Sequence, residues 1–280
     1  MFQSLSNSWR LVKASAAVLR ADKELIIFPL ISAIGVLLVT ATFALPMFFA
    51  GLFDSLFSGG SNGILFYVVL FLYYVVQYTV IIFANAALVG AAMIRLEGGD
   101  PTVGDGVRVA LDHFSQIMGF AVFSATVGII LRALSQRDGL GRFVASLVGM
   151  AWNLAIFLAV PVLVVENVGP WEAITRSTAL LKRTWGEQIA GNFGVGLIFM
   201  FIYIALIILG ILAVMLAIPT QTTPLIISVV LLVIFAFVLV ALAQSTLSGI
   251  YTAAVYQFAA TGKTGDFFDE SLVKNAFKQK

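Results

Sequence analysis

The sequence contains no cysteine and a single histidine, and only 11% of its 280 residues are charged. Without cysteine the chain has no disulfide framework, no thiolate nucleophile and no cysteine-based metal or iron–sulfur site. A water-soluble domain carries about 25% charged residues, so the low charge excludes the soluble classes. Sixteen basic and fourteen acidic residues leave a formal charge of +2, which is too small and too dispersed for a surface that binds nucleic acid.

Apolar side chains make up 61% of the chain, and the mean hydropathy is +1.05. A helix needs about 20 mostly apolar residues to cross a bilayer, and six stretches have about that length or more. They are residues 25–50, 64–94, 114–133, 143–165, 189–218 and 225–260. Backbone groups in lipid must form their hydrogen bonds within the segment. We therefore predict an all-α polytopic membrane bundle of six transmembrane helices.

The positions of Lys and Arg predict the orientation, because cytoplasmic loops retain positive charge. With both termini inside, 13 of the 16 basic residues lie inside and three lie outside. The sequence thus predicts a multi-pass protein of the cell (inner or plasma) membrane with both termini cytoplasmic. The three outside residues, Arg132, Arg137 and Arg142, leave a second interpretation open. In it, the third and fourth stretches form a shallow hairpin that does not cross fully.

A short amphipathic segment precedes each pair of stretches, at residues 5–19, 103–117 and 171–185. In each, apolar residues recur at spacings of three and four, which is the helical period, and charged residues lie on another face. Basic helices with aromatic apolar faces lie in the membrane interface. The residues that we expect to anchor the first and third helices there are Trp9, Arg10, Lys13, Trp171, Arg176 and Trp185.

This order of one interfacial helix and two spans occurs three times, which suggests an internal repeat within a single transmembrane domain, residues 1–260. Residues 261–280 would be a cytoplasmic tail. The repeats would be residues 1–94, 95–165 and 166–260. The segment Ser8-Trp-Arg-Leu-Val-Lys13 matches Ser177-Thr-Ala-Leu-Leu-Lys182. Triplication and chance similarity of common residue types both explain matches of this length.

No acidic, basic or histidine residue falls at mid-span, so no proton relay, metal cluster or catalytic triad forms at depth. We therefore predict that the chain is not an enzyme and has no cofactor; the neighbouring Asp112 and His113 are the only pair suited to acid–base chemistry. Uncharged polar residues at depth make up a candidate polar seam. They are Gln77, Asn85, Asn153, Gln244 and Ser248. Hydrogen bonds between helices and a path for a solute both explain such residues.

Three segments carry a resemblance to a known family: Ser8-Trp-Arg-Leu-Val-Lys13, Gly99-Asp-Pro-Thr-Val-Gly104, and Ile250–Gly262 followed by Phe267-Phe-Asp269. On these, the whole chain resembles a family of six-span prokaryotic membrane proteins without an assigned activity. More distantly, residues 171–182 are similar to the helix that precedes spans in the membrane domain of glycerophosphodiester phosphodiesterases. The catalytic residues of those enzymes belong to a separate soluble domain, so the resemblance implies no site residue here.

Two hypotheses for function follow. In the first, a non-enzymatic membrane protein organises lipid, a partner protein or a second copy of itself at the cytoplasmic face, where the tryptophans and basic stripes are expected; nucleic acid is not a partner. In the second, the chain is a passive channel or transporter for an uncharged or lipophilic solute that follows the polar seam. Coupling to protons would need a titratable group in the path, so this hypothesis predicts passive movement.

Overall fold

The computed structural model describes residues 2–49, 64–135, 139–185 and 195–274, and this part of the chain is helical and contains no strand. The helices follow in the order α1 (Phe2–Ala21), η1 (Lys23–Ile26), α2 (Ile27–Phe49), α4 (Ile64–Leu96), α5 (Val103–Asp112), α6 (Phe114–Ser135), α7 (Leu140–Ala155), α8 (Ala159–Glu166), α9 (Pro170–Trp185), α10 (Val195–Ala217), η3 (Ile218–Thr220), α11 (Thr223–Thr261) and α12 (Glu270–Lys274).

Six helical stretches among the described residues are long and apolar enough to cross a membrane, which confirms the predicted fold class. They correspond to η1 with α2, α4, α6, α7 with α8, α10 with η3, and α11. The order of one short helix and two long stretches runs through α1–α2–α4, α5–α6–α7/α8 and α9–α10–α11. Their origin by internal repetition stays a prediction.

The fourth span, predicted over residues 143–165 with a kink at Pro161, is interrupted more sharply than a kink. It is divided into α7 and α8 by a break at residues 156–158. Pro161 lies three residues beyond the break; it lacks an N–H group, and its ring collides with the carbonyl of the residue four positions earlier in a continuous helix. The break satisfies this constraint.

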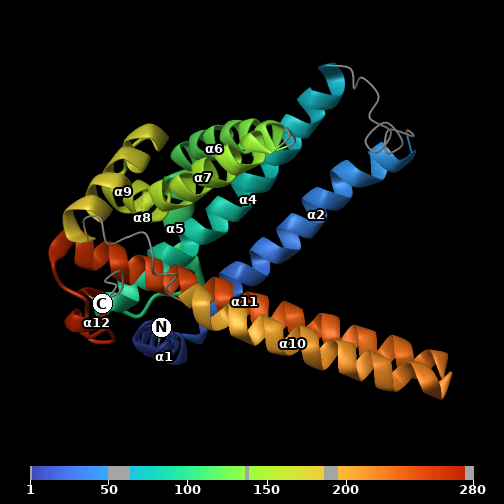
Figure 1. Cartoon of the computed structure of the whole chain (residues 1–280). Coiled ribbons are helices and arrows are strands. Elements are labelled where there is room, and N and C mark those ends of the chain that lie inside the picture. The colour runs from blue at the N-terminus through green and yellow to red at the C-terminus, as the bar shows by residue number, and fades with distance from the viewer. Residues whose placement is uncertain (1, 50–63, 136–138, 186–194, 275–280) are drawn as a thin grey trace.

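The long helices form two hairpins that diverge from a common base (Figure 1). One is α2 with α4 and the other is α10 with α11, and each pair packs along its length. At the base, α4 and α11 pack on each other, and a Cβ atom at Gly249 of α11 would lie 2.4 Å from Leu88 Cδ2 of α4. Small side chains let helix backbones approach closely in membranes.

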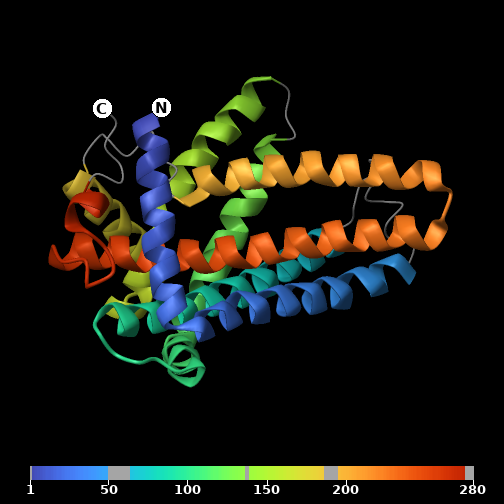
Figure 2. The ribbon, with the colours of Figure 1, turned by 90° about the horizontal axis from the view of Figure 1, so that it is seen from below.

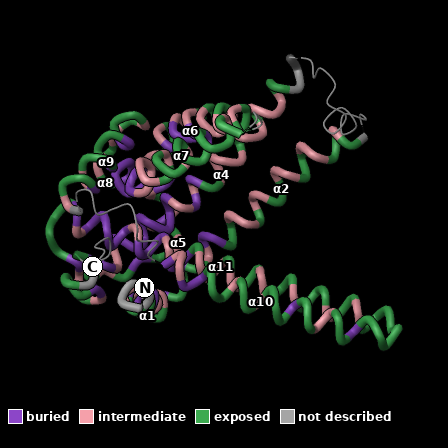
Figure 3. Tube along the Cα trace, in the orientation of Figure 1, coloured by how far each residue is buried: buried purple, intermediate pink, exposed green. Residues whose placement is uncertain are grey.

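The buried core lies at this base, and the outer halves of α10 and α11 are exposed (Figure 3). No residue in the most apolar stretch of α11 is buried, and large apolar side chains such as Leu209 and Leu216 are more than 60% exposed. Exposed apolar surface of this extent marks contact with a membrane or a partner. Lipid is the environment that fits these spans.

The helix α1 crosses the base of the long helices instead of running along them (Figure 2). It contacts α10 and α11, whereas α5 packs on α4, and α9 on α8 and α11. Both ends of the described chain lie at this end of the molecule (Figure 1). The short amphipathic helices therefore gather at one face, the arrangement expected for helices in a single membrane interface.

Candidate functional site

The exposed face of α1 combines an aromatic side chain with positive charge. Trp9 is 47% exposed, and Lys13 Nζ lies 5.5 Å from the centroid of its ring. Arg10 is exposed and lies 3.8 Å from Asp269, which is exposed as well. An exposed pair at this distance contributes less than about 1 kcal/mol, so Asp269 holds Arg10 only weakly.

The opposite side of α1 carries a row of buried residues that the apolar periodicity did not predict. Ser8, Leu11, Ser15 and Val18 are each at most 1% exposed. Their spacings of three and four place them on one helical face, which lies against α10 and α11. Serines were counted as polar in the sequence pattern, so this face was not recognised. Thus one face of α1 packs against the other helices, and the opposite face is exposed.

The helix α9 presents its predicted anchors differently. Trp171 is 70% exposed and meets Phe123 edge to face at 6.0 Å between ring centroids. Arg176 binds Glu166 and Glu172. The hydrogen bond to Glu172, and next the one to Glu166, raises the pKa of the Arg176 guanidinium. Arg176 is therefore engaged within the protein. The side chain of Trp185 lies outside the described residues.

Glu166 ties three helices together at this end of the bundle. It lies at the end of α8, accepts from Arg176 of α9, and accepts a hydrogen bond from Tyr256 Oη of α11 at 3.2 Å. Arg183 of α9 also donates to the backbone oxygen of Ala259, at 2.8 Å. Glu166 and Arg183 thus join α8, α9 and α11 through hydrogen bonds and an ion pair.

The helix α5 is capped and closely packed. Thr102 and Asp105 form a reciprocal capping box, and Val103 N donates to Glu24 Oε2 of η1 at 3.1 Å. The hydrogen bonds from the Thr102 side chain and backbone lower the pKa of the Asp105 carboxyl. His113 Nδ1 donates to Val109 O at 2.8 Å. Among the described residues, no group of His, Asp and Glu side chains is suited to hold a metal ion.

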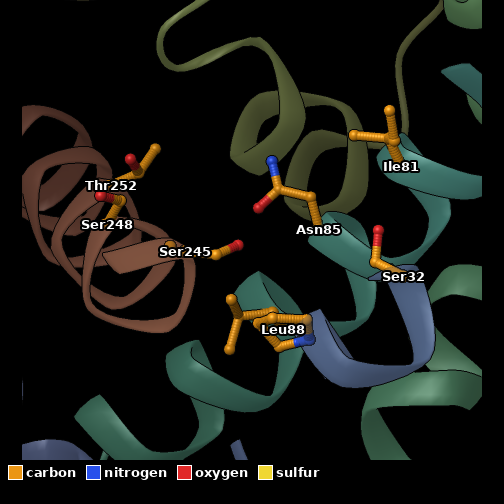
Figure 4. Close-up of a pocket in the computed structure, with 10 residues that line it drawn as sticks. Ser32, Ile81, Asn85, Leu88, Ser245, Ser248 and Thr252 are labelled. Carbon is orange, nitrogen blue, oxygen red and sulfur yellow. The ribbon is translucent and has the colours of Figure 1, made fainter. Parts of the chain in front are cut away.

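The polar seam is only partly assembled. Asn85 of α4 and Ser248 of α11 line one pocket of about 250 Å³, at the base of the fork between the two hairpins (Figure 4). Gln77 and Gln244 are half-buried on the same two helices and do not line it, and Gln77 Oε1 is buried without a partner among the described residues. Asn153 is exposed on α7. The pocket therefore involves two of the five predicted residues.

Three further polar side chains line the pocket: Ser32 of α2, and Ser245 and Thr252 of α11. Sequence reasoning did not select them as site residues. A signal existed for α11, because Ser245, Ser248 and Thr252 follow at spacings of three and four and so share one helical face. For Ser32 no such pattern is present, since its neighbours on α2 are apolar.

No curated protein and no solved structure matches the chain, so the resemblance to the membrane domain of glycerophosphodiester phosphodiesterases gains no support. A family model described as a family of unknown function, DUF6159, matches residues 64–268. This match begins with α4 and ends beyond α11, and it covers well over half of the 280 residues. The chain therefore belongs to this family of unknown function. This confirms the predicted resemblance to a family without an assigned activity.

Proposed function

We propose that the chain is a non-enzymatic membrane protein that organises lipid at the face formed by α1, α5 and α9. The observation that carries this proposal is the composition of α1, which contains three basic residues and no acidic one. Helices with basic and aromatic faces bind anionic lipid surfaces, and each Lys or Arg near such a surface contributes about 1 kcal/mol.

The exposed tryptophans support the same face. Trp9 and Trp171 belong to helices at the end of the molecule where both termini lie (Figure 1). Tryptophan is enriched at the level of the lipid headgroups because its ring is apolar and its N–H is polar. By the distribution of Lys and Arg, this face is cytoplasmic.

In contrast to the basic residues of α1, Arg176 of α9 is already paired with carboxylates of the protein. Arg176 is bound by Glu166 and Glu172, whereas Arg10 has only its exposed partner Asp269 among the ion pairs of the described residues, and Lys13 lies over Trp9. The anionic headgroups would therefore bind α1, and Arg176 would serve stability. A partner protein or a second copy of the chain would use the same face.

The test measures how spin-labelled lipids associate with the full chain in vesicles. We expect phosphatidylglycerol to associate more strongly than phosphatidylcholine. Arg10→Gln with Lys13→Gln should reduce this preference by about thirtyfold, since two charges at about 1 kcal/mol each sum to about 2 kcal/mol. Arg176→Gln is the matched control and should leave the preference unchanged. Equal association of both lipids with the wild-type protein would refute the proposal.

A second candidate function is passive movement of an uncharged solute. The pocket between α2, α4 and α11 favours it, because its lining contains polar side chains and no charged one. Flux of glycerol into vesicles that contain the protein, measured by light scattering, tests it. A flux that Asn85→Leu abolishes supports this function, and a flux equal to that of empty vesicles excludes it.

A further inference from the structure

The pocket at the fork is a space that the interfacial function does not use. Its walls come from the first turns of α2 and from the C-terminal halves of α4 and α11 (Figure 4). Its volume of about 250 Å³ corresponds to about eight water molecules at about 30 Å³ each. This is room for a small polar group and not for a whole lipid.

Five uncharged polar side chains line this space, and none of them hydrogen-bonds to another part of the described chain. The five are Ser32, Asn85, Ser245, Ser248 and Thr252. Asn85 and Ser245 point toward one another across the pocket (Figure 4). Polar groups within a bilayer are costly when they lack hydrogen-bond partners. A molecule that donates and accepts hydrogen bonds would satisfy these groups.

The lining also limits what that molecule can be. Pro29, Ile81 and Leu88 supply apolar walls, and no charged residue is among the ten that line the pocket. A phosphate or carboxylate would lack a counter-charge there, and burying an unpaired ion is strongly unfavourable. The ligand class is thus neutral, with hydroxyl or carbonyl groups at one end.

The position of the pocket indicates where the rest of the ligand would lie. Asn85 is eleven positions before the end of α4 at Leu96, about 16 Å at 1.5 Å per residue, so the pocket lies well inside the apolar part of the helix. Beyond it the two hairpins diverge (Figure 1). Large apolar side chains of the diverging helices, such as Leu38 of α2 and Leu239 of α11, are at least 50% exposed. A hydrocarbon chain is suited to this surface.

We infer that the pocket binds the polar end of a neutral lipid with ester and hydroxyl groups, the chemistry of a diacylglycerol. The Asn85 amide would donate to an ester carbonyl, and its oxygen, with the hydroxyls of Ser245 and Ser248, would accept from and donate to the glycerol hydroxyl. The acyl chains lie between the hairpins. This inference is independent of the lipid preference proposed for α1.

The test uses the full chain in vesicles with a diacylglycerol that carries a photoreactive diazirine, and mass spectrometry locates the labelled peptides. We expect labelling of α2, α4 and α11 around the pocket, competed by unlabelled diacylglycerol and not by phosphatidic acid. Asn85→Leu should reduce this labelling by about fivefold, the effect of about one lost hydrogen bond. Asn153→Leu, the same change at an exposed asparagine of α7, should leave it unchanged.

Ser245→Ala with Ser248→Ala gives a second variant, which removes two hydroxyls without adding volume and should also reduce labelling. Labelling spread evenly along the chain would mean that the pocket holds water only and would overturn the inference. Equal competition by phosphatidic acid, or equal labelling of the Asn85 and Asn153 variants, would overturn it as well. The preference of α1 for phosphatidylglycerol would survive each of these results.

Discussion

The backbone N–H of Leu158 donates to Ser177 Oγ at 3.1 Å. Leu158 lies in the break between α7 and α8, where the interrupted helix leaves an N–H group without its usual acceptor, and Ser177 of α9 is fully buried. One side chain of a short helix thus completes the hydrogen bonding of a broken span.

Replacing this serine should destabilise the protein. In Ser177→Ala the buried N–H of Leu158 loses its acceptor, which costs about 1–3 kcal/mol. Ser8→Ala is the matched control, because Ser8 is equally buried and its Oγ has no partner among the described residues. Thermal unfolding in detergent should show a lower Tm for the first variant only, and equal Tm values would contradict this role of Ser177.

A nearly buried ion pair links α4 to the α1–η1 junction. Arg95 Nη2 lies 3.4 Å from Asp22 Oδ2, and the Asp22 side chain is 4% exposed. Asp22→Asn keeps an acceptor for Glu24 N–H but removes the buried one of the two carboxylates that pair with Arg95, which costs about 1.5–3 kcal/mol. Arg95 also pairs with Asp100, which is 93% exposed, so Asp100→Asn should cost less than about 1 kcal/mol. Denaturant titrations of both variants test this difference, and equal losses would refute it.

Close packing of α5 on α4 depends on Gly106. A Cβ atom at this position would lie 2.7 Å from the backbone oxygen of Ala87, whereas a Cβ at Gly104 would meet only Thr102 Oγ1, at 3.5 Å. Gly106→Ala must therefore displace one helix, with a cost of about 1–3 kcal/mol. Gly104→Ala should be tolerated. If both variants unfold at the wild-type temperature, α5 does not pack on α4 as described.

The capping box of α5 should make stability depend on pH. Because the Thr102 hydrogen bonds lower the pKa of Asp105 in the folded protein, this carboxylate contributes stability above its unfolded pKa of about 3.9, and the contribution is lost as pH falls through the lower folded value. Asp105→Asn should thus reduce the loss of Tm below about pH 4. An Asp105→Asn variant that loses Tm below about pH 4 as steeply as the wild type would contradict this.

The spans could be predicted from sequence because hydrocarbon imposes both length and helical structure. The predicted stretch 64–94 corresponds to Ile64–Leu96, and 225–260 falls within Thr223–Thr261. Residues 189–194 of the fifth stretch lie outside the described residues. Pro161 predicts a kink in the fourth span, because proline removes a backbone hydrogen bond. The full break at residues 156–158 was not located, since the apolar composition continues through it.

The candidate site was harder to predict. An apolar residue that faces lipid and one that faces protein have the same character in a sequence, so periodicity alone did not separate the exposed Trp9 from the buried face of Ser8 and Leu11. Likewise, Asn85 and Asn153 have the same chemistry, but only Asn85 lies where three helices meet. That meeting depends on contacts between distant segments, which spacing does not encode.

The central claim is that the long helices cross a membrane with both ends of the described chain on its cytoplasmic side. Because the chain has no cysteine, single cysteines report accessibility without background. In sealed cells treated with a membrane-impermeant maleimide, we predict labelling of Thr220→Cys, in the turn between α10 and α11, and labelling of Arg20→Cys and Lys263→Cys only after lysis. Labelling of Thr220→Cys and Lys263→Cys from the same side would contradict the account.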